Sequence, residues 1–589
     1  MAETPAATAD ALASSLAAQA VLGEAAAPDA ADAPARNAAG EAESEEERGL
    51  CRVCNGTPRN VVWTACGHCV VCEACHREVM RLSAKCVLCA LPILEDSGVL
   101  VLDLAAFAPQ PGGLQPARTY MPEQLDAAAA ELARAAAGGP REVSQRQVAE
   151  LRRLMAVLAA GGDADALVPA VADVRRILSN QNNTVLDALL QVAFAEGVMV
   201  HLIALMQRVD ALVLQAAAMA TIGQIVLGDG FAMQVIQAGA VPHLLRLVES
   251  TNVGIVDEAL MTIGNIAGES RMCRDRLLTA GAVAPILAAL DAPNVAAPEA
   301  GAEGLILKRR IAWVLANLCR GKPQPPFEAV KPMLPALMRL VQGEDEEVLQ
   351  EACWALSYVS DGTNDKIEAV LETGVCSRLV GLLVHPSPEV IVPALRAMGN
   401  IVTGNDQQTQ KALDCGVLRR LLDLVTLPYT KNIKKEACWA ISNITAGNQD
   451  QIQAVLDANL AGPLIQLLAS AEFEIKKEVA WALGNATGSS TAEQIRHLVG
   501  EGCVKPMCDL LTCHDARIVT VAMEGLQHIL KMGASDRDEA GGSVNQYAKF
   551  VEEAGGVEKL NELQSHSDID VVDHANIFLE LYFKTEEES

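Results

Sequence analysis

The stretch Glu351-Ala-Cys-Trp354-Ala-Leu-Ser-Tyr358-Val-Ser-Asp361 contains the pattern that decides the fold. Read at the helical period, its Ala, Leu and Val at positions 352, 356 and 359 share one apolar face, and its acidic and aromatic residues share another. The second face recurs as Glu436-Trp439-Asn443 and as Glu478-Trp481-Asn485. An isolated tryptophan would be read as a core residue. A core stripe, however, would not carry a carboxylate and an amide on one face in successive copies. We therefore interpret the stripe as the lining of a groove.

Such a groove has a definite chemistry. Neighbouring indoles leave slots for the methylene stem of a lysine or arginine, and cation–π attraction adds ~0.5–2 kcal/mol per slot. An asparagine side chain offers a donor and an acceptor to an extended peptide backbone. Carboxylates at the slot ends supply charge complementarity. The pattern predicts an extended basic peptide as the ligand.

Helix-ending residues recur at a fixed period from about residue 146 onward. An apolar-flanked glycine stands at 239, 281, 374, 416 and 502, and Asn459 takes its place in one copy. Glycine, and next asparagine, is preferred where a helix ends in the left-handed conformation. Most intervals are 42 or 43 residues, within the range of armadillo and HEAT repeats. The chain is thus predicted to be all-α and to stack into a right-handed α-solenoid with one helix of each unit lining a concave face.

The groove position recurs at matching intervals as Gln224, Asn265, Asn317, Tyr358, Asn400, Asn443 and Asn485. The one long interval, from 265 to 317, is explained by a Pro/Ala/Gly-rich insertion around 291–304. Residues 534–547 are expected to form a polar loop, and 548–583 a last helical unit that caps the stack.

Composition limits the classes of function. The net charge of −28 argues against nucleic acid or an anionic membrane as the main partner and favours basic partners. No apolar run approaches the ~18 residues of a spanning helix, and no secretory signal is recognised. Of 17 cysteines, eight crowd into 51–89 and the others are scattered singly. This distribution predicts a metal cluster and buried thiols in a reducing compartment.

The cysteine cluster has metal-ligand spacing. Eight ligands in four pairs satisfy two tetrahedral zinc ions, and so short a segment needs the metal in order to fold. The ligands are Cys51, Cys54, Cys66, His68, Cys72, Cys75, Cys86 and Cys89.

This segment resembles the RING finger, closest to the form in apoptosis-inhibitor proteins, in the strings Arg59-Asn-Val-Val-Trp63 and Cys66-Gly-His68. The resemblance implies interleaved sites, with Cys51, Cys54, Cys72 and Cys75 on one zinc and the other four ligands on the second. It also implies recruitment of a ubiquitin-conjugating enzyme. Val53 keeps the usual aliphatic contact, but Val87 and Ala90 replace the proline and the basic residue of many active RING fingers. An active ligase and a zinc-binding interaction module both stay open.

Over about 210–583 the sequence resembles importin-α, the nuclear-import adaptor. The matching strings include Asn265-Ile-Ala-Gly, Ala394-Leu-Arg396-Ala-Met-Gly-Asn400-Ile-Val-Thr403-Gly and Ser442-Asn-Ile-Thr-Ala-Gly447-Asn-Gln-Asp-Gln-Ile. The resemblance implies that basic nuclear localisation signals lie along the Trp/Asn ladder, with importin-β as carrier and the cytoplasm and nucleus as location. Together with the repeated stripe, it gives as peptide-binding residues Asn265, Glu269, Trp313, Asn317, Trp354, Tyr358, Asp361, Arg396, Asn400, Thr403, Asp406, Glu436, Trp439, Asn443, Glu478, Trp481 and Asn485.

The family has two such sites, and here they depart unequally from its pattern. At the N-terminal site, Ala220 and Met261 replace tryptophans, and Arg310 precedes Trp313 by one turn. At the C-terminal site the pattern is intact. The acidic segment 1–49 also cannot serve as the family's basic carrier-binding segment. The expected domains are a disordered tail (1–49), a RING finger (50–94), a linker (95–145) with a helix at 123–137, the solenoid (146–583) and an acidic tail (584–589).

Three functions follow from these observations. The first is an importin-α-like adaptor with an appended RING finger. The second is a RING-type ubiquitin ligase that uses the groove as its substrate receptor, and the third is a catenin-like scaffold. Such scaffolds favour basic grooves, whereas this groove repeats glutamate.

Overall fold

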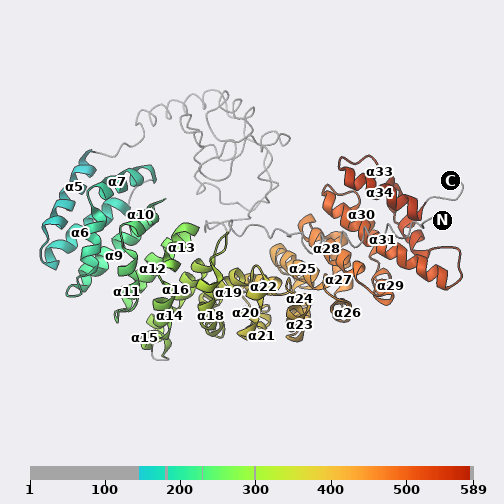
Figure 1. The fold of residues 1–589 in the computed structure, drawn as a ribbon, viewed down its shortest axis with the longest axis horizontal. Helices are drawn as coiled ribbons and strands as arrows, with labels where there is room; N and C mark the ends of the chain where they lie inside the picture. Colours follow the sequence, from blue (N-terminus) through green and yellow to red (C-terminus); the bar gives the residue numbers. More distant parts are fainter. Residues whose placement is uncertain (1–144, 180–182, 229, 298–299, 584–589) are drawn as a thin grey trace, which may run out of the picture. The chain divides into compact units, whose positions relative to one another are not determined.

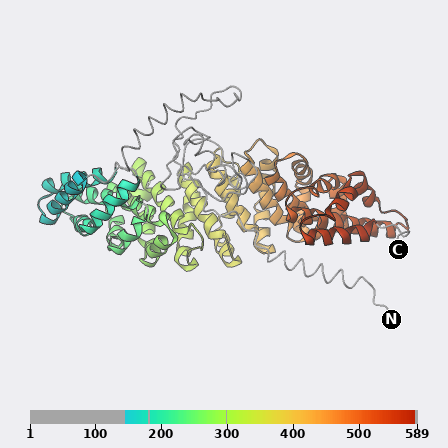
Figure 2. The ribbon, with the colours of Figure 1, turned by 90° about the horizontal axis from the view of Figure 1, so that it is seen from above.

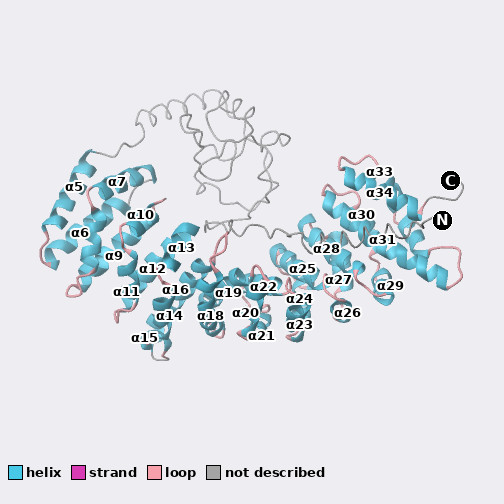
Figure 3. Ribbon diagram, in the orientation of Figure 1, coloured by secondary structure: helices cyan, strands magenta, loops and turns pink. Residues whose placement is uncertain are grey.

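A computed structural model describes residues 145–589 except 180–182, 229, 298–299 and 584–589. These residues form helices and connecting turns without a strand (Figure 3). No single helix among them has both the length and the apolar character to cross a bilayer, although three bent helix pairs reach that threshold when each pair is taken together. The predicted tail 1–49, the RING finger with its eight zinc ligands, the linker with its helix at 123–137, and the tail 584–589 lie outside the described residues.

The array from Ala149 onward is a compact unit of its own. One helix of each repeat stacks on its counterpart in the next repeat, along the inner side of the array's curve (Figure 1). We call these the inner helices: α6 (Ala164–Ser179), α9 (Leu212–Val226), α12 (Val253–Glu269), α16 (Gly301–Cys319), α19 (Glu346–Ser360), α22 (Pro388–Ile401), α25 (Lys431–Thr445), α28 (Phe473–Gly488), α31 (Ala516–Glu539) and α34 (Ile569–Tyr582).

The remaining helices connect and cover the inner ones. They are α5 (Gln145–Ala160), α7 (Asn183–Ala195), α8 (Val198–Met206), α10 (Phe231–Gln237), α11 (Val241–Val248), α13 (Arg271–Thr279), α14 (Val283–Asp291), α15 (Pro293–Ala296), α17 (Phe327–Val330), the 3₁₀ helix η5 (Lys331–Met333), α18 (Leu334–Val341), α20 (Asn364–Glu372), α21 (Cys376–Leu382), α23 (Asp406–Asp414), α24 (Val417–Thr426), α26 (Gln449–Asp457), α27 (Ala461–Ser470), α29 (Ala492–Gly500), α30 (Val504–Leu510), α32 (Gln546–Glu553) and α33 (Gly556–Leu563). Figure 2 shows that the chain advances along the array without turning back. Each repeat therefore contacts its neighbours in sequence, which makes the array a solenoid.

The periodic helix-ending residues have the predicted conformation. Gly239, Gly281, Gly374, Gly416 and Gly502 all have positive φ, between 76° and 90°. Asn459, in the position of the missing glycine, has a φ of 58° and is the one non-glycine residue with positive φ among those described. The left-handed residue turns the chain between two helices of the same repeat, so its spacing sets the repeat length.

The apolar face predicted on residues 351–361 is the packed face of α19. Ala352 and Leu356 are completely buried and Val359 is 4% exposed. Burying a leucine of this kind stabilises the fold by about 1.5–3 kcal/mol. The opposite face of α19, with Trp354 and Tyr358, is only half-buried.

A second set of ties joins successive repeats away from the inner helices. Gln408, at the start of α23, completes a capping box with Asn405, and its Nε2 donates to the carbonyl of Asn364 at 2.9 Å. Gln451 and Gln494 repeat this arrangement at the starts of α26 and α29. One buried glutamine thus caps its own helix and fixes the spacing to the preceding repeat.

One detail differs from the sequence-based expectation. The sequence predicts a polar loop over 534–547, but α31 continues to Glu539, and the connection to α32 is only 540–545. The prediction is wrong for 534–539, because these polar residues occupy the last turns of a long helix, where charge is solvated. The insertion around 291–304 contains the short helix α15 and the start of α16.

Candidate peptide-binding groove

The predicted groove residues lie on successive inner helices. Those at the C-terminal end, which we call the C-terminal half-groove, are Arg396 and Asn400 on α22, Glu436, Trp439 and Asn443 on α25, and Glu478, Trp481 and Asn485 on α28. Those at the other end, the N-terminal half-groove, are Asn265 on α12 and Trp313 and Asn317 on α16. Trp354 and Tyr358 on α19 lie between the two halves.

Glycines on the preceding inner helix support two of the tryptophans. A Cβ atom on Gly399 would lie 2.2 Å from Cζ3 of Trp439, and one on Gly264 would lie 2.0 Å from Cζ3 of Trp313. Each indole therefore rests directly on a backbone that tolerates no side chain at that point. Sequence reasoning missed these residues, although the signal is present: each such glycine directly precedes a ladder asparagine, as in Gly264-Asn265 and Gly399-Asn400.

Three ladder asparagines use their amide nitrogen to tie neighbouring repeats. The Nδ2 atom of Asn317 donates to the carbonyl of Gly264 at 3.2 Å, that of Asn400 to Ser357 at 2.8 Å, and that of Asn485 to Ser442 at 3.0 Å. In each case the acceptor lies on the preceding inner helix, one residue before that helix's own ladder position. The sequence pattern assigns both the donor and the acceptor to a peptide. In these three residues the amide nitrogen is already engaged, in Asn400 also with Oγ of Ser360 at 3.3 Å, whereas the amide oxygen makes no hydrogen bond within the described residues.

Asn443 departs from this arrangement. Its Nδ2 atom is buried and has no hydrogen-bond partner among the described residues. The Oε2 atom of Glu436, two helical turns earlier on α25, is also buried without a partner there. Leaving a buried polar atom unpaired costs about 1–3 kcal/mol, more if it is charged. A donor and an acceptor on one helix face are thus both left unsatisfied.

The two glutamates of this half are both shifted toward the neutral form. Burial raises the pKa of Glu436, against the opposing influence of Arg396 and Lys435. Burial also raises the pKa of Glu478 to about 7, with Glu436 and Glu474 adding repulsion and Lys435 and Lys477 opposing it. Arg396 and the neighbouring lysines therefore do not fully offset the burial of these acids, and an added cation would stabilise their ionised form.

Arg396 covers one side of Trp439. Its guanidinium carbon lies 5.3 Å from the centre of the indole, and its terminal nitrogen donates to Oε1 of Glu436 at 2.7 Å. Because Arg396 and Gly399 both belong to α22, the side of Trp439 toward α22 is filled by the protein itself. Trp481, in the ladder position of the next inner helix α28, is 40% exposed, an unusual value for an indole.

The N-terminal half-groove is occupied in a comparable way by Arg310. Its guanidinium carbon lies 5.7 Å from the centre of the Trp313 ring, and its Nε donates to Oδ1 of Asp257 on α12 at 2.9 Å. Sequence reasoning identifies Arg310 as a repelling cation but misses its partner Asp257. Ala220, in the first tryptophan position, is buried, and Met261, in the second, is half-buried.

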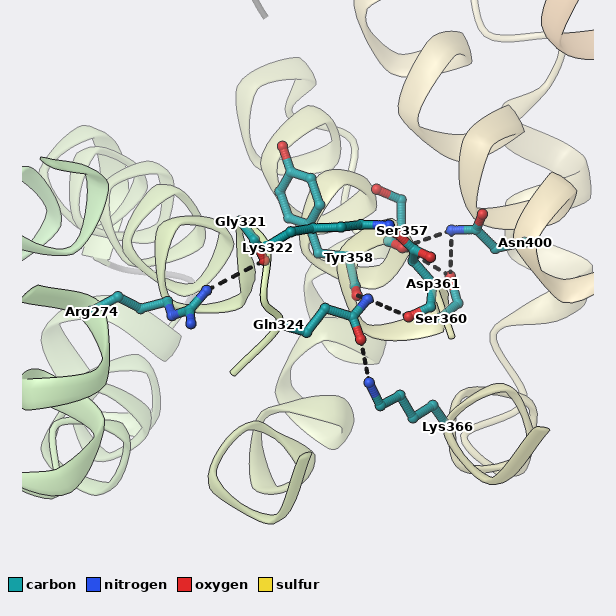
Figure 4. A network of polar contacts seen from close by, with 10 residues as sticks. All are labelled: Arg274, Gly321, Lys322, Gln324, Ser357, Tyr358, Ser360, Asp361, Lys366 and Asn400. Atoms are coloured by element: carbon teal, nitrogen blue, oxygen red, sulfur yellow. Dashed lines mark hydrogen bonds and ion pairs between the residues drawn. The ribbon is translucent and has the colours of Figure 1, made fainter. Parts of the chain in front are cut away.

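The middle of the ladder is also engaged internally. Lys322, in the turn after α16, forms an ion pair with Asp361 at 3.2 Å (Figure 4). Tyr358 stacks on Trp354, with ring centres 5.8 Å apart. The same turn is fixed by Gln324, which donates to the carbonyls of Tyr358 and Asp361, and by the buried Arg274, which donates to the carbonyl of Pro323 at 3.0 Å. The sequence predicts that Asp361 binds a peptide cation, but a lysine of the chain already holds it.

The last three predicted residues lie where inner helices end. Thr403 follows α22 and donates to the carbonyl of Asn400 at 2.7 Å. Asp406 begins α23 and accepts from Asn448 at 3.0 Å. Glu269 ends α12 and accepts from the thiol of Cys273 at 3.2 Å. All three are exposed. Within the described part of the chain, no cluster of His, Cys, Asp and Glu is arranged to hold a metal ion.

Comparisons with known proteins agree with the armadillo fold. The pattern of the Armadillo/beta-catenin-like repeat matches residues 229–268, 323–361, 363–403, 405–446 and 448–488, and an atypical Arm repeat matches 545–589. Importin subunit alpha-1b of Oryza sativa subsp. japonica is 44% identical over 427 residues, which cover 72% of this chain and 78% of the relative. The chain belongs to the importin-α family. Importin subunit alpha-4 of Arabidopsis thaliana is 46% identical over 428 residues, covering 72% of this chain and 77% of that protein.

Two further findings complete the comparison. An engineered protein of known crystal structure matches 74% of this importin-α family member and 99% of itself, with a TM-score of 0.63 and 27% identity. The predicted right-handed armadillo solenoid is thereby confirmed. The pattern of the C3HC4-type zinc finger (RING finger) matches residues 47–95, a range that contains all eight predicted ligands. The chain thus carries a zinc-binding RING finger as well as its armadillo repeats.

Proposed function

We propose that the protein is a nuclear-import adaptor that holds basic nuclear localisation peptides in the C-terminal half-groove. One observation carries the proposal: Oε2 of Glu436 and Nδ2 of Asn443, which flank Trp439 in the sequence of α25, are buried without hydrogen-bond partners among the described residues. The carboxylate oxygen suits the head of a lysine or arginine lying against the indole, and the amide suits a peptide carbonyl. Both unsatisfied atoms would gain a partner from the same extended basic segment.

Among the described residues, the N-terminal half-groove has no such unpaired carboxylate or amide atom. Arg310 stacks on Trp313 and pairs with Asp257, so a peptide lysine would have to displace a formed ion pair without gaining an unpaired acid. Lys322 likewise holds Asp361. We infer that the two halves are unequal and that one peptide segment binds chiefly across residues 396–485. Titration of the solenoid with a lysine-rich localisation peptide tests the proposal, which a lack of binding would refute.

The raised pKa of Glu478 predicts that the affinity for a basic peptide depends on pH. Its raised pKa of about 7 means that the side chain is mostly neutral at pH 6 and mostly ionised at pH 8. A peptide cation prefers the ionised form, so affinity is expected to rise about 3- to 10-fold from pH 6 to pH 8. Fluorescence anisotropy across this range checks the result, and Glu478→Gln is expected to flatten the profile. A wild-type profile that is flat or falls with pH would contradict the assignment.

The same shift gives the free protein the opposite pH dependence in stability. The folded-state pKa of Glu478 lies above its ordinary value of 4.5, so the folded chain binds more protons than the unfolded chain between these values. The contribution of this group to stability is therefore complete below about pH 4.5 and is lost as the pH rises through 7. Peptide binding opposes the loss by stabilising the carboxylate.

The partners and location follow from the family. Both relatives are named as importin subunits, which supports importin-β as the carrier partner and the cytoplasm and nucleus as the places of action. We do not assign carrier binding to residues 1–49, because their acidic composition does not suit the role of a basic carrier-binding segment. Co-purification of importin-β with the full chain tests this partner.

The RING finger is proposed to hold two zinc ions. Cys51, Cys54, Cys72 and Cys75 would hold one ion, and the remaining four ligands the other. We expect metal analysis to give two zinc ions per chain. Cys72→Ser is expected to unfold 51–89 while leaving the melting of the armadillo array unchanged, because a segment with so small a core depends on the metal. One zinc or none per wild-type chain would disprove the assignment.

A ubiquitin ligase is the second candidate function, favoured by the RING match over residues 47–95. In many active RING fingers the basic residue directly after the last ligand bonds to ubiquitin and holds its conjugate with the conjugating enzyme closed. Here that residue is Ala90, so this contact would be weak. We expect slow discharge of ubiquitin from a conjugating enzyme and faster discharge with Ala90→Arg, measured in a single-turnover assay. No discharge even with Ala90→Arg would favour a non-catalytic interaction module.

A further inference from the structure

The ladder of groove positions continues past Trp481 and Asn485 onto α31. Glu524 and His528 follow Trp481 and Asn485 by 43 residues each, which is the repeat interval. α31 packs directly on α28, as α28 packs on α25. Glu524 therefore stands in the tryptophan position of the next repeat, and His528 in the asparagine position.

The contact of His528 with the preceding helix supports this alignment. A Cβ atom on Gly488 of α28 would lie 3.5 Å from Cε1 of His528. In the N-terminal half-groove, a Cβ atom on Gly268 of α12 would lie 3.4 Å from Nδ2 of Asn317. The imidazole thus lies over the last turn of α28 in the way that a ladder amide lies over the last turn of α12.

Both side chains are without partners among the described residues. The Glu524 carboxylate is half-buried, with no hydrogen bond or ion pair to any of them, and burial alone raises its pKa. Nδ1 of His528 is buried and unpaired. Burial, with repulsion from Lys531, lowers the pKa of His528, so the ring is neutral near pH 7. A carboxylate that lacks a cation and an imidazole that lacks a hydrogen bond therefore lie one turn apart.

The next inner helix marks the end of this open stretch. His574 of α34 is hydrogen-bonded through Nε2 to Oε1 of Gln527 at 3.0 Å. Gln527 directly precedes His528, as Ser442 directly precedes Asn443, but the acceptor here is a side-chain oxygen, whereas Asn485 donates to the backbone carbonyl of Ser442. The ring of His574 is thus hydrogen-bonded to a side chain of α31, whereas the side chains of Glu524 and His528 have no hydrogen bond among the described residues.

We propose that Glu524 and His528 form an additional peptide subsite that accepts one more lysine or arginine of a basic segment longer than the part held at Trp439 and Trp481. Glu524 supplies the counter-ion to the cation. His528 takes the role of a ladder asparagine by hydrogen-bonding the peptide backbone. The subsite rests on the proposed function, because it extends the same bound segment.

The required length follows from the packing of the array. Neighbouring packed helices lie about 8–10 Å apart, and an extended chain advances roughly 3.3–3.6 Å per residue. The additional lysine must therefore stand about two or three residues beyond the one held at Trp481. A short core peptide cannot reach Glu524, but a slightly longer one can.

Calorimetric titration of the full chain with three peptides tests the subsite. The core peptide carries a short lysine/arginine run between glycines, and each longer peptide adds alanines and one lysine at one end or the other. We expect one longer peptide to bind about 3- to 10-fold more tightly than the core. Glu524→Gln should remove this gain and leave core affinity within about 2-fold. Glu539→Gln, the same charge change at the exposed end of α31, should keep the gain.

Charge reversal sharpens the assignment and guards against a folding defect. With Glu524→Lys, a longer peptide carrying glutamate in place of the added lysine should bind more tightly than the lysine version. Because Glu524 has no partner to lose among the described residues, the melting temperature of Glu524→Gln should not fall. A gain that survives Glu524→Gln, or equal binding of core and longer peptides, would overturn the subsite alone. Failure of the core peptide itself to bind would overturn the proposed function and the subsite with it.

Discussion

Replacing Trp439 and Trp481 together with alanine is expected to weaken binding of a basic localisation peptide at least ~10-fold, or about 1.4 kcal/mol. Buried aromatic anchors commonly contribute on the order of 1–3 kcal/mol each. Here Trp439 lies between Glu436 and Asn443 along α25, whose Oε2 and Nδ2 atoms are unpaired among the described residues, and the indole of Trp481 in the next repeat is exposed. Without both indoles, the methylene stem of the peptide lysine is no longer held on its sides. The site is also wider and more accessible to water, which weakens the attraction between Glu436 or Glu478 and the peptide cation. Isothermal titration calorimetry measures the loss directly.

Trp313→Ala is the matched control, because it makes the same truncation in the N-terminal half-groove. Its indole is already covered by Arg310, so the peptide is expected to lose little affinity. Met261→Trp would add the missing neighbouring indole. Because Arg310 already stacks on Trp313, the added indole should strengthen peptide binding at the N-terminal half-groove most when it is combined with Arg310→Ala. A larger loss from Trp313→Ala than from the double variant would refute the preference for residues 396–485. Binding should also weaken with added salt, since part of the attraction is between exposed charges.

The repeat architecture is predictable from sequence because it depends on local, periodic signals. A left-handed residue at a helix end is most often glycine and next asparagine, so positions such as Gly416 and Asn459 mark repeat boundaries through residue type and spacing. The buried face of α19 follows from helical spacing in the same way. The length of α31 is not predictable by this reasoning, since polar residues are compatible with either a solvated helix or a loop.

The groove is predictable as a set of positions but not as a set of free groups. Sequence identifies Asp361 and Arg396 as groove residues, yet it does not reveal that Lys322 pairs with the first or that Glu436 pairs with the second. These partners lie 39 and 40 residues away along the chain, so only the stacking of repeats brings them together. For the same reason sequence cannot distinguish the engaged amides of Asn317 and Asn400 from the unpaired one of Asn443. Pairing, not residue type, decides which part of the ladder is open.

Gly399→Ala is expected to impair both stability and peptide binding, although alanine is ordinarily the better helix former. The added Cβ would lie 2.2 Å from Cζ3 and 2.7 Å from Cε3 of Trp439, so the indole has to move. Overpacking of this kind costs about 1–3 kcal/mol, against roughly 1 kcal/mol gained from helix propensity. The displaced indole no longer faces Glu436 and Asn443 correctly, and peptide affinity is expected to fall about 10-fold. Thermal melting and calorimetry measure the two effects.

Two matched glycine variants distinguish a local effect on Trp439 from a general loss of stability. Gly381 lies in α21, where a Cβ atom would meet no heavy atom within 4 Å, so Gly381→Ala should leave stability unchanged or raise it by up to about 1 kcal/mol. Gly264→Ala creates the corresponding clash with Trp313, at 2.0 Å, and should be destabilising to a similar extent. Because Trp313 lies in the half-groove that Arg310 fills, Gly264→Ala should nevertheless leave peptide affinity within about 2-fold of wild type. Equal losses of affinity from Gly264→Ala and Gly399→Ala would mean that peptide binding responds to the integrity of the whole array. A loss confined to Gly399→Ala would locate the binding slot at Trp439.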